Sequence, residues 1–310
     1  MKKKVQFGKK EVSSVVLGLM RTQNLSEKEL EDVLDTAYGA GIDMLDCADI
    51  YVKGQSEELL GEVFLKRPDL RQKFFLQDKC GIVKESKDLV YYDFSKEHIL
   101  SCVNQSLERL HTDHLDSLLL HRPDALMEPS EIQETFEQLY REGKVLSFGV
   151  SNFNPAMIEM LQKGVKFPLI ADQIQLSLGH AGAFASGFEF NMDTEVSPTR
   201  DGGILEYCRA NGIVIQAWST LQYGFMEGSI LDGKKFPKLN KVLERIGEEK
   251  GVSKATIALA WILRYPGPVQ AITGSMNPVH ILEAAKAMDT EISRREWYEL
   301  LTASNGRVLP

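Results

Sequence analysis

Residues 115–121, LDSLLLH, form a short apolar run that ends in a histidine, and seven other runs of this kind recur along the chain. The eight runs lie at residues 14–19, 42–46, 73–79, 115–121, 145–151, 169–175, 213–219 and 269–273. Short runs that are almost continuously apolar are typical of parallel strands covered on both faces. The sequence therefore predicts eight buried strands.

Capping residues and amphipathic spacing predict helices between these runs. Ser26 and Glu29 have the spacing of a capping box, which opens the first helix. Further helix starts are predicted at Ser56, at Ser95, at Asn154 with Pro155, and at Ser253. Ile132, Phe136 and Leu139 have the spacing of the apolar face of another helix. Helices that alternate with buried strands indicate repeated βαβ units.

Eight such units without a linker-like change in composition predict a single domain over residues 1–310. We expect an α/β protein with a closed (β/α)8 TIM barrel, preceded by an N-terminal β-hairpin at residues 5–12, VQFGKKEV. A doubly wound open sheet is the alternative. The absence of a GxGxxG pattern after the first strand counts against that alternative.

Composition narrows the classes of function. The formal charge of −8 argues against a nucleic-acid partner, because such proteins need a basic surface. No apolar run approaches the roughly twenty residues of a membrane span, and the basic start lacks the apolar stretch of a signal peptide. No CxxC spacing occurs among the four cysteines, Cys47, Cys80, Cys102 and Cys208. We therefore expect buried free thiols and no metal site. Free thiols are typical of a cytoplasmic protein, which we also expect.

Polar or aromatic side chains stand at or near the ends of six predicted strands. They are Asp46, Lys79, His121, Ser151, Gln173 and Trp218. Functional residues of a barrel lie on its carboxyl-terminal rim, so we expect these side chains to converge there. Tyr51 follows Asp46 by five positions, in DCADIYVKG. A phenol beside an ammonium, a carboxylate and an imidazole makes a proton donor suited to carbonyl reduction at neutral pH.

The sequence resembles the aldo-keto reductase superfamily over nearly its whole length, and especially bacterial oxidoreductases with a TDHLDxLLxHRPD strand. Here that strand is TDHLDSLLLHRPD, residues 112–124. The other matching segments are DCADIY (46–51), LQDKCGI (76–82), GKVLSFGVSNF (143–153), ADQIQLS (171–177), QAWSTL (216–221) and ITGSMNPVHILEA (272–284).

The resemblance implies roles for four residues in reducing an aldehyde or ketone to the alcohol. Tyr51 would be the general acid that protonates the carbonyl oxygen. Lys79 would lower the pKa of that phenol, and Asp46 would pair with Lys79. His121 would hydrogen-bond the substrate oxygen as a neutral imidazole.

A nicotinamide cofactor would supply the hydride, since no side chain can. By resemblance, Ser151, Asn152 and Gln173 would hold its carboxamide, and Trp218 would stack on its ring. The remaining cofactor residues implied are Leu19, Met20, Asp46, Ser219, Thr220, Leu221, Ser275, Met276, Asn277, His280 and Glu283. The Lys and Arg residues that hold the 2'-phosphate of NADP in many members are missing near Gly274, and His280 stands in place of an Arg. NADP is the expected cofactor, with NAD as the alternative.

The identity of the carbonyl substrate and the oligomeric state do not follow from the sequence. The long stretch 179–203 is expected to shape the mouth of the pocket. Two other functions stay open. Lys79 could form a Schiff base in a lyase, or the chain could be a non-catalytic, nicotinamide-binding regulatory subunit.

Overall fold

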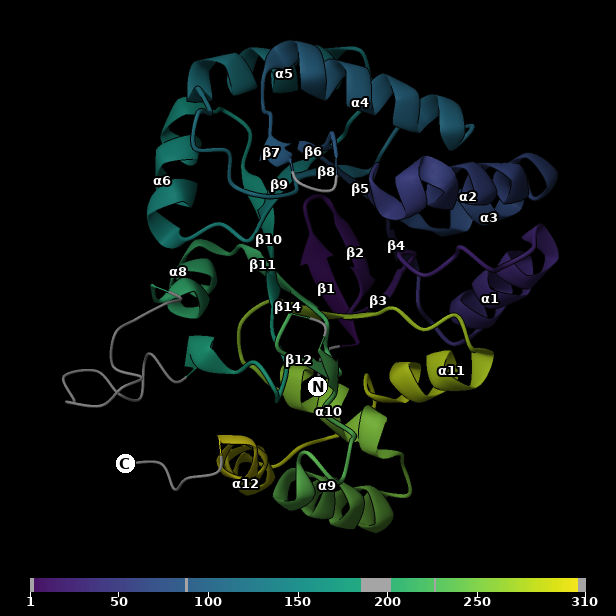
Figure 1. Ribbon diagram of the computed structural model, residues 1–310, viewed down its shortest axis with the longest axis vertical. Helices are drawn as coiled ribbons and strands as arrows, with labels where there is room; N and C mark the ends of the chain where they lie inside the picture. Colours follow the sequence, from purple (N-terminus) through teal and green to yellow (C-terminus); the bar gives the residue numbers. More distant parts are fainter. Residues whose placement is uncertain (1–2, 87–88, 185–201, 226, 306–310) are drawn as a thin grey trace.

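A computed structural model describes residues 3–86, 89–184, 202–225 and 227–305, and its centre is a closed barrel of parallel strands ringed by helices (Figure 1). Around the barrel the strands are β3 (Val15–Gly18), β4 (Met44–Asp46), β5 (Phe75–Cys80), β8 (Ser117–Leu120), β9 (Phe148–Ser151), β10 (Leu169–Gln175), β11 (Val214–Trp218) and β14 (Val269–Thr273). Each predicted run contains one of these strands. The (β/α)8 barrel is thus confirmed, and the doubly wound sheet is wrong.

The described helices are α1 (Glu27–Gly39), α2 (Gln55–Lys66), α3 (Pro68–Lys73), α4 (Lys96–Arg109), α5 (Pro129–Arg141), α6 (Pro155–Gly164), α8 (Ile204–Asn211), α9 (Pro237–Lys250), α10 (Lys254–Leu263), α11 (Pro278–Lys286) and α12 (Arg294–Asn305). In the part of the chain that the structure describes, none of them is long and apolar enough to span a membrane. All four cysteines are buried and free.

Most predicted helix caps are confirmed. Ser26 forms the complete capping box, and Ser95, Asn154 and Ser253 each accept a backbone hydrogen bond in the first turn of their helices. The prediction that Ser56 caps a helix is wrong. Helix α2 already begins at Gln55, after Gly54 in a left-handed conformation (φ 88°), and the buried Ser56 hydroxyl instead lies 2.8 Å from the Thr22 hydroxyl.

The predicted N-terminal hairpin is confirmed as β1 (Lys4–Phe7) and β2 (Lys10–Ser13), which pair antiparallel. Figure 1 shows it in the middle of the ring of helices. Phe7 is fully buried, with its ring 5.4 Å from that of Phe75 at the start of β5. The hairpin therefore closes the amino-terminal end of the barrel.

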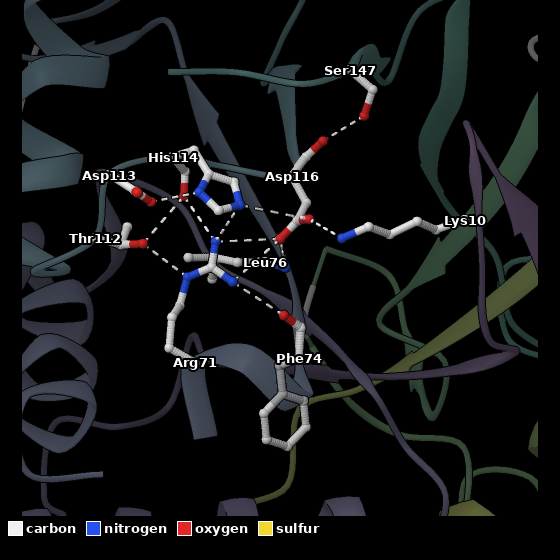
Figure 2. Close-up of polar contacts among 9 residues, drawn as sticks. All are labelled: Lys10, Arg71, Phe74, Leu76, Thr112, Asp113, His114, Asp116 and Ser147. Carbon is white, nitrogen blue, oxygen red and sulfur yellow. Dashed lines mark hydrogen bonds and ion pairs between the residues drawn. The ribbon is translucent and has the colours of Figure 1, made fainter. Parts of the chain in front are cut away.

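A buried carboxylate ties the hairpin to the barrel. Asp116, directly before β8, accepts hydrogen bonds from Lys10 Nζ at 2.7 Å and from the Leu76 backbone N–H at 2.9 Å (Figure 2). The guanidinium of Arg71 lies 3.4 Å from the same carboxylate. Three donors from different segments thus converge on one side chain.

The barrel interior contains a layer of four buried glutamine side chains, Gln77, Gln173, Gln216 and Gln270. Gln77 and Gln173 donate to Gln216 Oε1 at 2.9 and 3.2 Å, and Gln216 donates to Gln270 at 2.9 Å. Gln270 in turn donates to the Ser13 carbonyl in the hairpin at 2.9 Å. Hydrogen bonds therefore cross the barrel and reach its closed end.

Candidate active site

Asp46 and Lys79 form a buried ion pair at the carboxyl ends of the neighbouring strands β4 and β5. Lys79 Nζ lies 2.7 Å from Asp46 Oδ1 and donates to the Cys47 carbonyl at 2.6 Å. Gln77 and Gln173 also donate to Asp46 Oδ1, at 2.7 and 2.9 Å. Burial alone would lower the pKa of Lys79, but the charges of Asp46 and Tyr51 and the hydrogen bond to Asp46 raise it above its usual value. Lys79 is therefore a cation, which disfavours the Schiff-base lyase.

Tyr51 lies on a 3-10 turn, η1 (Tyr51–Gly54), between β4 and α2. The two residues after it adopt left-handed backbone conformations, with φ of 50° at Val52 and 58° at Lys53. This turn presents the Tyr51 ring to Lys79, whose Nζ lies 5.0 Å from the ring centroid. Burial raises the pKa of the Tyr51 phenol, and the Lys79 charge opposes that rise without cancelling it. The effect of Lys79 on this pKa thus has the expected sign, but burial outweighs it.

His121 lies directly after β8 and faces Tyr51 edge-on, with the two ring centroids 6.1 Å apart. Burial, and then the charges of Lys79 and Arg122, lower the pKa of His121 well below its usual value. Its Nδ1 is buried and accepts no hydrogen bond from the described residues. The imidazole is therefore neutral, as expected. Its contact with a substrate stays a prediction.

The opposite wall of the site is a chain of hydrogen bonds from β9 to β11. Ser151 Oγ donates to the Gln173 carbonyl and accepts from Asn152 Nδ2, both at 2.8 Å. Asn152, with φ of 61°, accepts from Trp218 Nε1 at 3.2 Å. The half-buried Trp218 ring also lies 5.8 Å from the Arg122 guanidinium. These contacts fix the orientation of the indole and of the Asn152 amide.

Gln173 faces the barrel interior as well as the site. Its Nε2 is committed to Asp46 and Gln216, whereas its Oε1 accepts no hydrogen bond from the described residues. An amide oxygen beside Asn152 and a flat indole fits the carboxamide and ring of a nicotinamide.

Two residues assigned to the cofactor by resemblance are shielded from solvent. Leu19 is fully buried in the core, and Thr220 is 4% exposed, with Oγ1 donating to the Ile272 carbonyl at 3.0 Å. Ser219, with φ of 50°, donates to Gln222 at 2.9 Å. The other residues of these loops are half-buried, namely Met20, Leu221 and Met276. Contacts of all these residues with a cofactor stay predictions.

The loop after β14 presents polar groups at the start of α11. Asn277 caps this helix by accepting from the Val279 backbone N–H at 2.9 Å. Ser275 Oγ lies 3.1 Å from Nδ1 of the exposed His280. Glu283 is half-buried one turn further on. A helix N-terminus beside a hydroxyl group and an exposed imidazole fits a phosphate.

A cation that we did not expect reaches this corner from the first barrel loop. The side chain of Arg21 is exposed, and its Nη1 lies 3.5 Å from the carbonyl oxygen of Gly274. The two are neighbours because β14 pairs with β3, with Thr273 beside Leu17, where the barrel closes. Sequence reasoning looked for the cation close to Gly274 along the chain and missed one 253 positions away. Closure of the predicted barrel was the signal that could have found it.

The fold and these residues define a class, the (β/α)8-barrel oxidoreductases that use a nicotinamide cofactor. A profile of the Aldo/keto reductase family matches residues 14–304, nearly the whole chain. The chain belongs to the Aldo/keto reductase family and is an NAD(P)H-dependent reductase.

Similar proteins include bacterial oxidoreductases. The chain is 32% identical over 308 residues to a 6-dehydroglucose reductase of Agrobacterium fabrum, covering 96% of both chains. It is 34% identical over 307 residues to the oxidoreductase YcsN of Bacillus subtilis, again covering 96% of both. Among solved structures, an aldo-keto reductase of Klebsiella pneumoniae in complex with NADPH superimposes with a TM-score of 0.74 at 25% identity, covering 100% of this chain and 96% of the other.

Proposed function

We propose that this protein reduces an aldehyde or ketone to the alcohol, with Tyr51 as the general acid. The observation that carries the proposal is the buried Lys79–Asp46 pair at 2.7 Å, with Lys79 Nζ 5.0 Å from the Tyr51 ring centroid and the neutral His121 ring edge-on to Tyr51. When bound, a reduced nicotinamide supplies the hydride to the carbonyl carbon. The chain itself supplies the proton and the geometry.

The electrostatics of the site suit Tyr51 to donating this proton. Its pKa is raised by burial, so the phenol is protonated at neutral pH before the reaction. As Tyr51 passes its proton to the carbonyl oxygen, the phenolate that forms is stabilised by the Lys79 ammonium. Asp46 keeps that ammonium in place, and His121 donates a hydrogen bond that orients the substrate oxygen.

We propose NADP as the cofactor, with NAD as the alternative. Trp218 would stack on the nicotinamide, and Ser151, Asn152 and Gln173 would hold its carboxamide. Arg21 and His280 at the start of α11 would hold the phosphates. The NADPH bound to the similar reductase of Klebsiella pneumoniae supports this choice.

For the substrate we propose a small polar carbonyl compound. Arg122 adjoins His121, lies over Trp218 and forms no ion pair with the described residues, so its N–H groups are available to a hydroxyl or carboxylate. The 32% identical relative is named for a sugar substrate, which supports a polar pocket. The stretch expected to shape the mouth falls mostly outside the described residues, at 185–201.

Two broader predictions accompany this function. We propose that residues 1–310 form one domain, which the family match over residues 14–304 supports. We also propose a cytoplasmic protein, which the four buried free thiols support.

The experiment is to follow the absorbance of NADPH with a panel of small aldehydes and ketones, using the purified chain and its Tyr51→Phe variant. We expect turnover by the wild type and a loss of about 10²- to 10⁴-fold in the variant, with unchanged cofactor affinity. Equal turnover by Tyr51→Phe would reject Tyr51 as the acid. Tight NADPH binding without turnover of any compound would favour the regulatory subunit.

A further inference from the structure

Two buried carboxyl groups meet outside the barrel wall, behind the catalytic Lys79. Asp78 lies between Gln77 and Lys79 on β5, and Glu57 on α2 lies near it. Asp78 is 1% exposed, and Glu57 is fully buried. Side chains alternate along a strand, so Asp78 points away from the interior that Lys79 occupies.

Hydrogen-bond accounting leaves one oxygen of each carboxyl group without a donor. Asp78 Oδ1 accepts from the Lys79 backbone N–H at 2.9 Å, and Glu57 Oε2 accepts from Arg109 Nε at 2.8 Å. Asp78 Oδ2 and Glu57 Oε1 are buried and accept nothing from the described residues. The Glu57 carboxyl group nevertheless lies near Asp78, since it is among the causes that raise the pKa of Asp78. Two carboxylate oxygens can bond only if one of them carries a proton.

The surrounding charges favour retention of that proton. Asp49, in the loop after β4, also faces this cluster, and burial raises its pKa to about 7. Arg109, on α4, is the cation that pairs with Glu57. The Arg109 charge also acts on Asp49, so one guanidinium serves a cluster of three carboxyl groups. The thiols that border the cluster are neutral, since burial raises the pKa of each: Cys47, Cys80 and Cys102. Burial, followed by the charge of Glu57, raises the pKa of Asp78 well above its usual value.

We propose that Asp78 and Glu57 share one proton, carried by Asp78, and that this hydrogen bond fixes α2 against β5 and so positions Tyr51 beside Lys79. Each end of the bond lies close along the chain to one of the two catalytic residues. Helix α2 follows η1, which carries Tyr51, without a break, and Asp78 is the neighbour of Lys79. Asp78 and Glu57 are positioning residues here. The effect on Tyr51 rests on the proposed function, whereas the shared proton does not.

The bond is lost when the pH rises. An acid whose pKa is higher in the folded than in the unfolded chain contributes stability that is complete below its ordinary value, near 3.9. That contribution is lost as the pH rises through the folded value. Ionised Asp78 and Glu57 would then repel each other, and the contact between α2 and β5 would loosen. We expect turnover and stability to fall together at alkaline pH.

Asp78→Asn is the central variant, because an asparagine amide donates to Glu57 without titrating. Asp49 and Asp172 also hold protons near neutral pH in both proteins. The infrared spectrum of the wild type minus that of Asp78→Asn should therefore show one further protonated carboxyl band, which Asp78 contributes. Asp78→Asn should retain the wild-type kcat and lose less stability to urea at alkaline pH. Asp78→Ala, which cannot donate, should lose on the order of 10- to 100-fold in kcat.

Glu57→Gln tests which group holds the proton and covers the case in which Asp78→Ala does not fold. It removes the charge that Arg109 needs, so it should lower stability more than Asp78→Asn does. The reverse order would place the proton on Glu57 and overturn the assignment. A wild-type spectrum without a band sensitive to Asp78→Asn would overturn the shared proton. Loss of kcat in Asp78→Asn equal to that in Asp78→Ala would overturn the positioning role. A wild type with the band but without reductase activity would instead reject the proposed function.

Discussion

Replacing Asp116 by asparagine should destabilise the closed end of the barrel without changing catalysis. Figure 2 shows the carboxylate between Lys10, Arg71 and the backbone of Leu76. Its side chain is 1% exposed. Asparagine has nearly the same shape and keeps one acceptor oxygen, so the substitution removes the charge and leaves the packing unchanged.

The magnitude follows from the three donors. The Lys10 side chain is 59% exposed, so its ion pair contributes at most about 1 kcal/mol. The Leu76 N–H would exchange a charged acceptor for a neutral one, at a cost of about 1 kcal/mol. Removing one partner of a buried ion pair costs roughly 3–5 kcal/mol. The loss at Arg71 should be about 1 kcal/mol, well below that range, because Arg71 keeps three acceptors, namely Thr112 Oγ1 and the Phe74 and His114 carbonyls. The sum is about 3 kcal/mol.

Urea unfolding followed by circular dichroism would measure this loss, with Lys10→Ala as the matched control. We expect about 3 kcal/mol for Asp116→Asn and under about 1 kcal/mol for Lys10→Ala. The kcat measured far below the unfolding transition should be unchanged, because Tyr51 lies at the other end of the barrel. Equal losses in the two variants would show that the exposed lysine, and not the buried contacts, carries the stabilisation.

Three further outcomes are expected. Lys79→Met should lower turnover about as much as Tyr51→Phe, roughly 10²- to 10⁴-fold, because the phenolate loses its counter-charge and Asp46 its ion pair; retained kcat would refute the role of Lys79. Trp218→Ala should abolish most of the fluorescence quenching that NADPH causes, since Trp261 and Trp297 are buried and stacked on each other with centroids 5.2 Å apart; quenching that survives would assign the stacking to another residue. Asp172 is fully buried, and burial raises its pKa to about 8, so the stability that it contributes is complete below about 4 and lost as the pH rises through about 8. Asp172→Asn should therefore unfold at a higher temperature than the wild type at pH 9, and equal melting temperatures there would contradict the raised pKa.

The barrel strands could be predicted because each is a short apolar run that must be covered on both faces. Most helix starts could be predicted as well, since a side-chain cap acts within three residues of its partner. The failure at Ser56 has a local cause. The helix already begins at Gln55, after Gly54 in its left-handed conformation, so Gly54 occupies the N-cap position and Ser56 lies within the first turn.

Long-range contacts in the site were harder to predict. The pairing of Lys79 with Asp46 was expected from resemblance, and its distance of 2.7 Å agrees. Arg21 was missed because its place depends on how the barrel closes. The contact of Asp78 with Glu57 depends on which face of α2 packs on β5, and a single sequence does not specify that rotation. The pKa of Tyr51 depends on the balance of burial against one charge, which only coordinates can weigh.

The glutamine layer has a consequence for how the chain accommodates the charge of Asp46. The four amides act as an internal solvent whose molecules cannot turn. Gln77 and Gln173 each donate to both Asp46 and Gln216, and Gln216 donates to Gln270, so inverting one amide would leave its neighbours unpaired. Water around an exposed carboxylate reorients whenever a nearby charge changes, and that reorientation adds to the barrier of a reaction. Here the amides that donate to Asp46 are set when the protein folds, so the proposed proton transfer from Tyr51 would need no rearrangement of them.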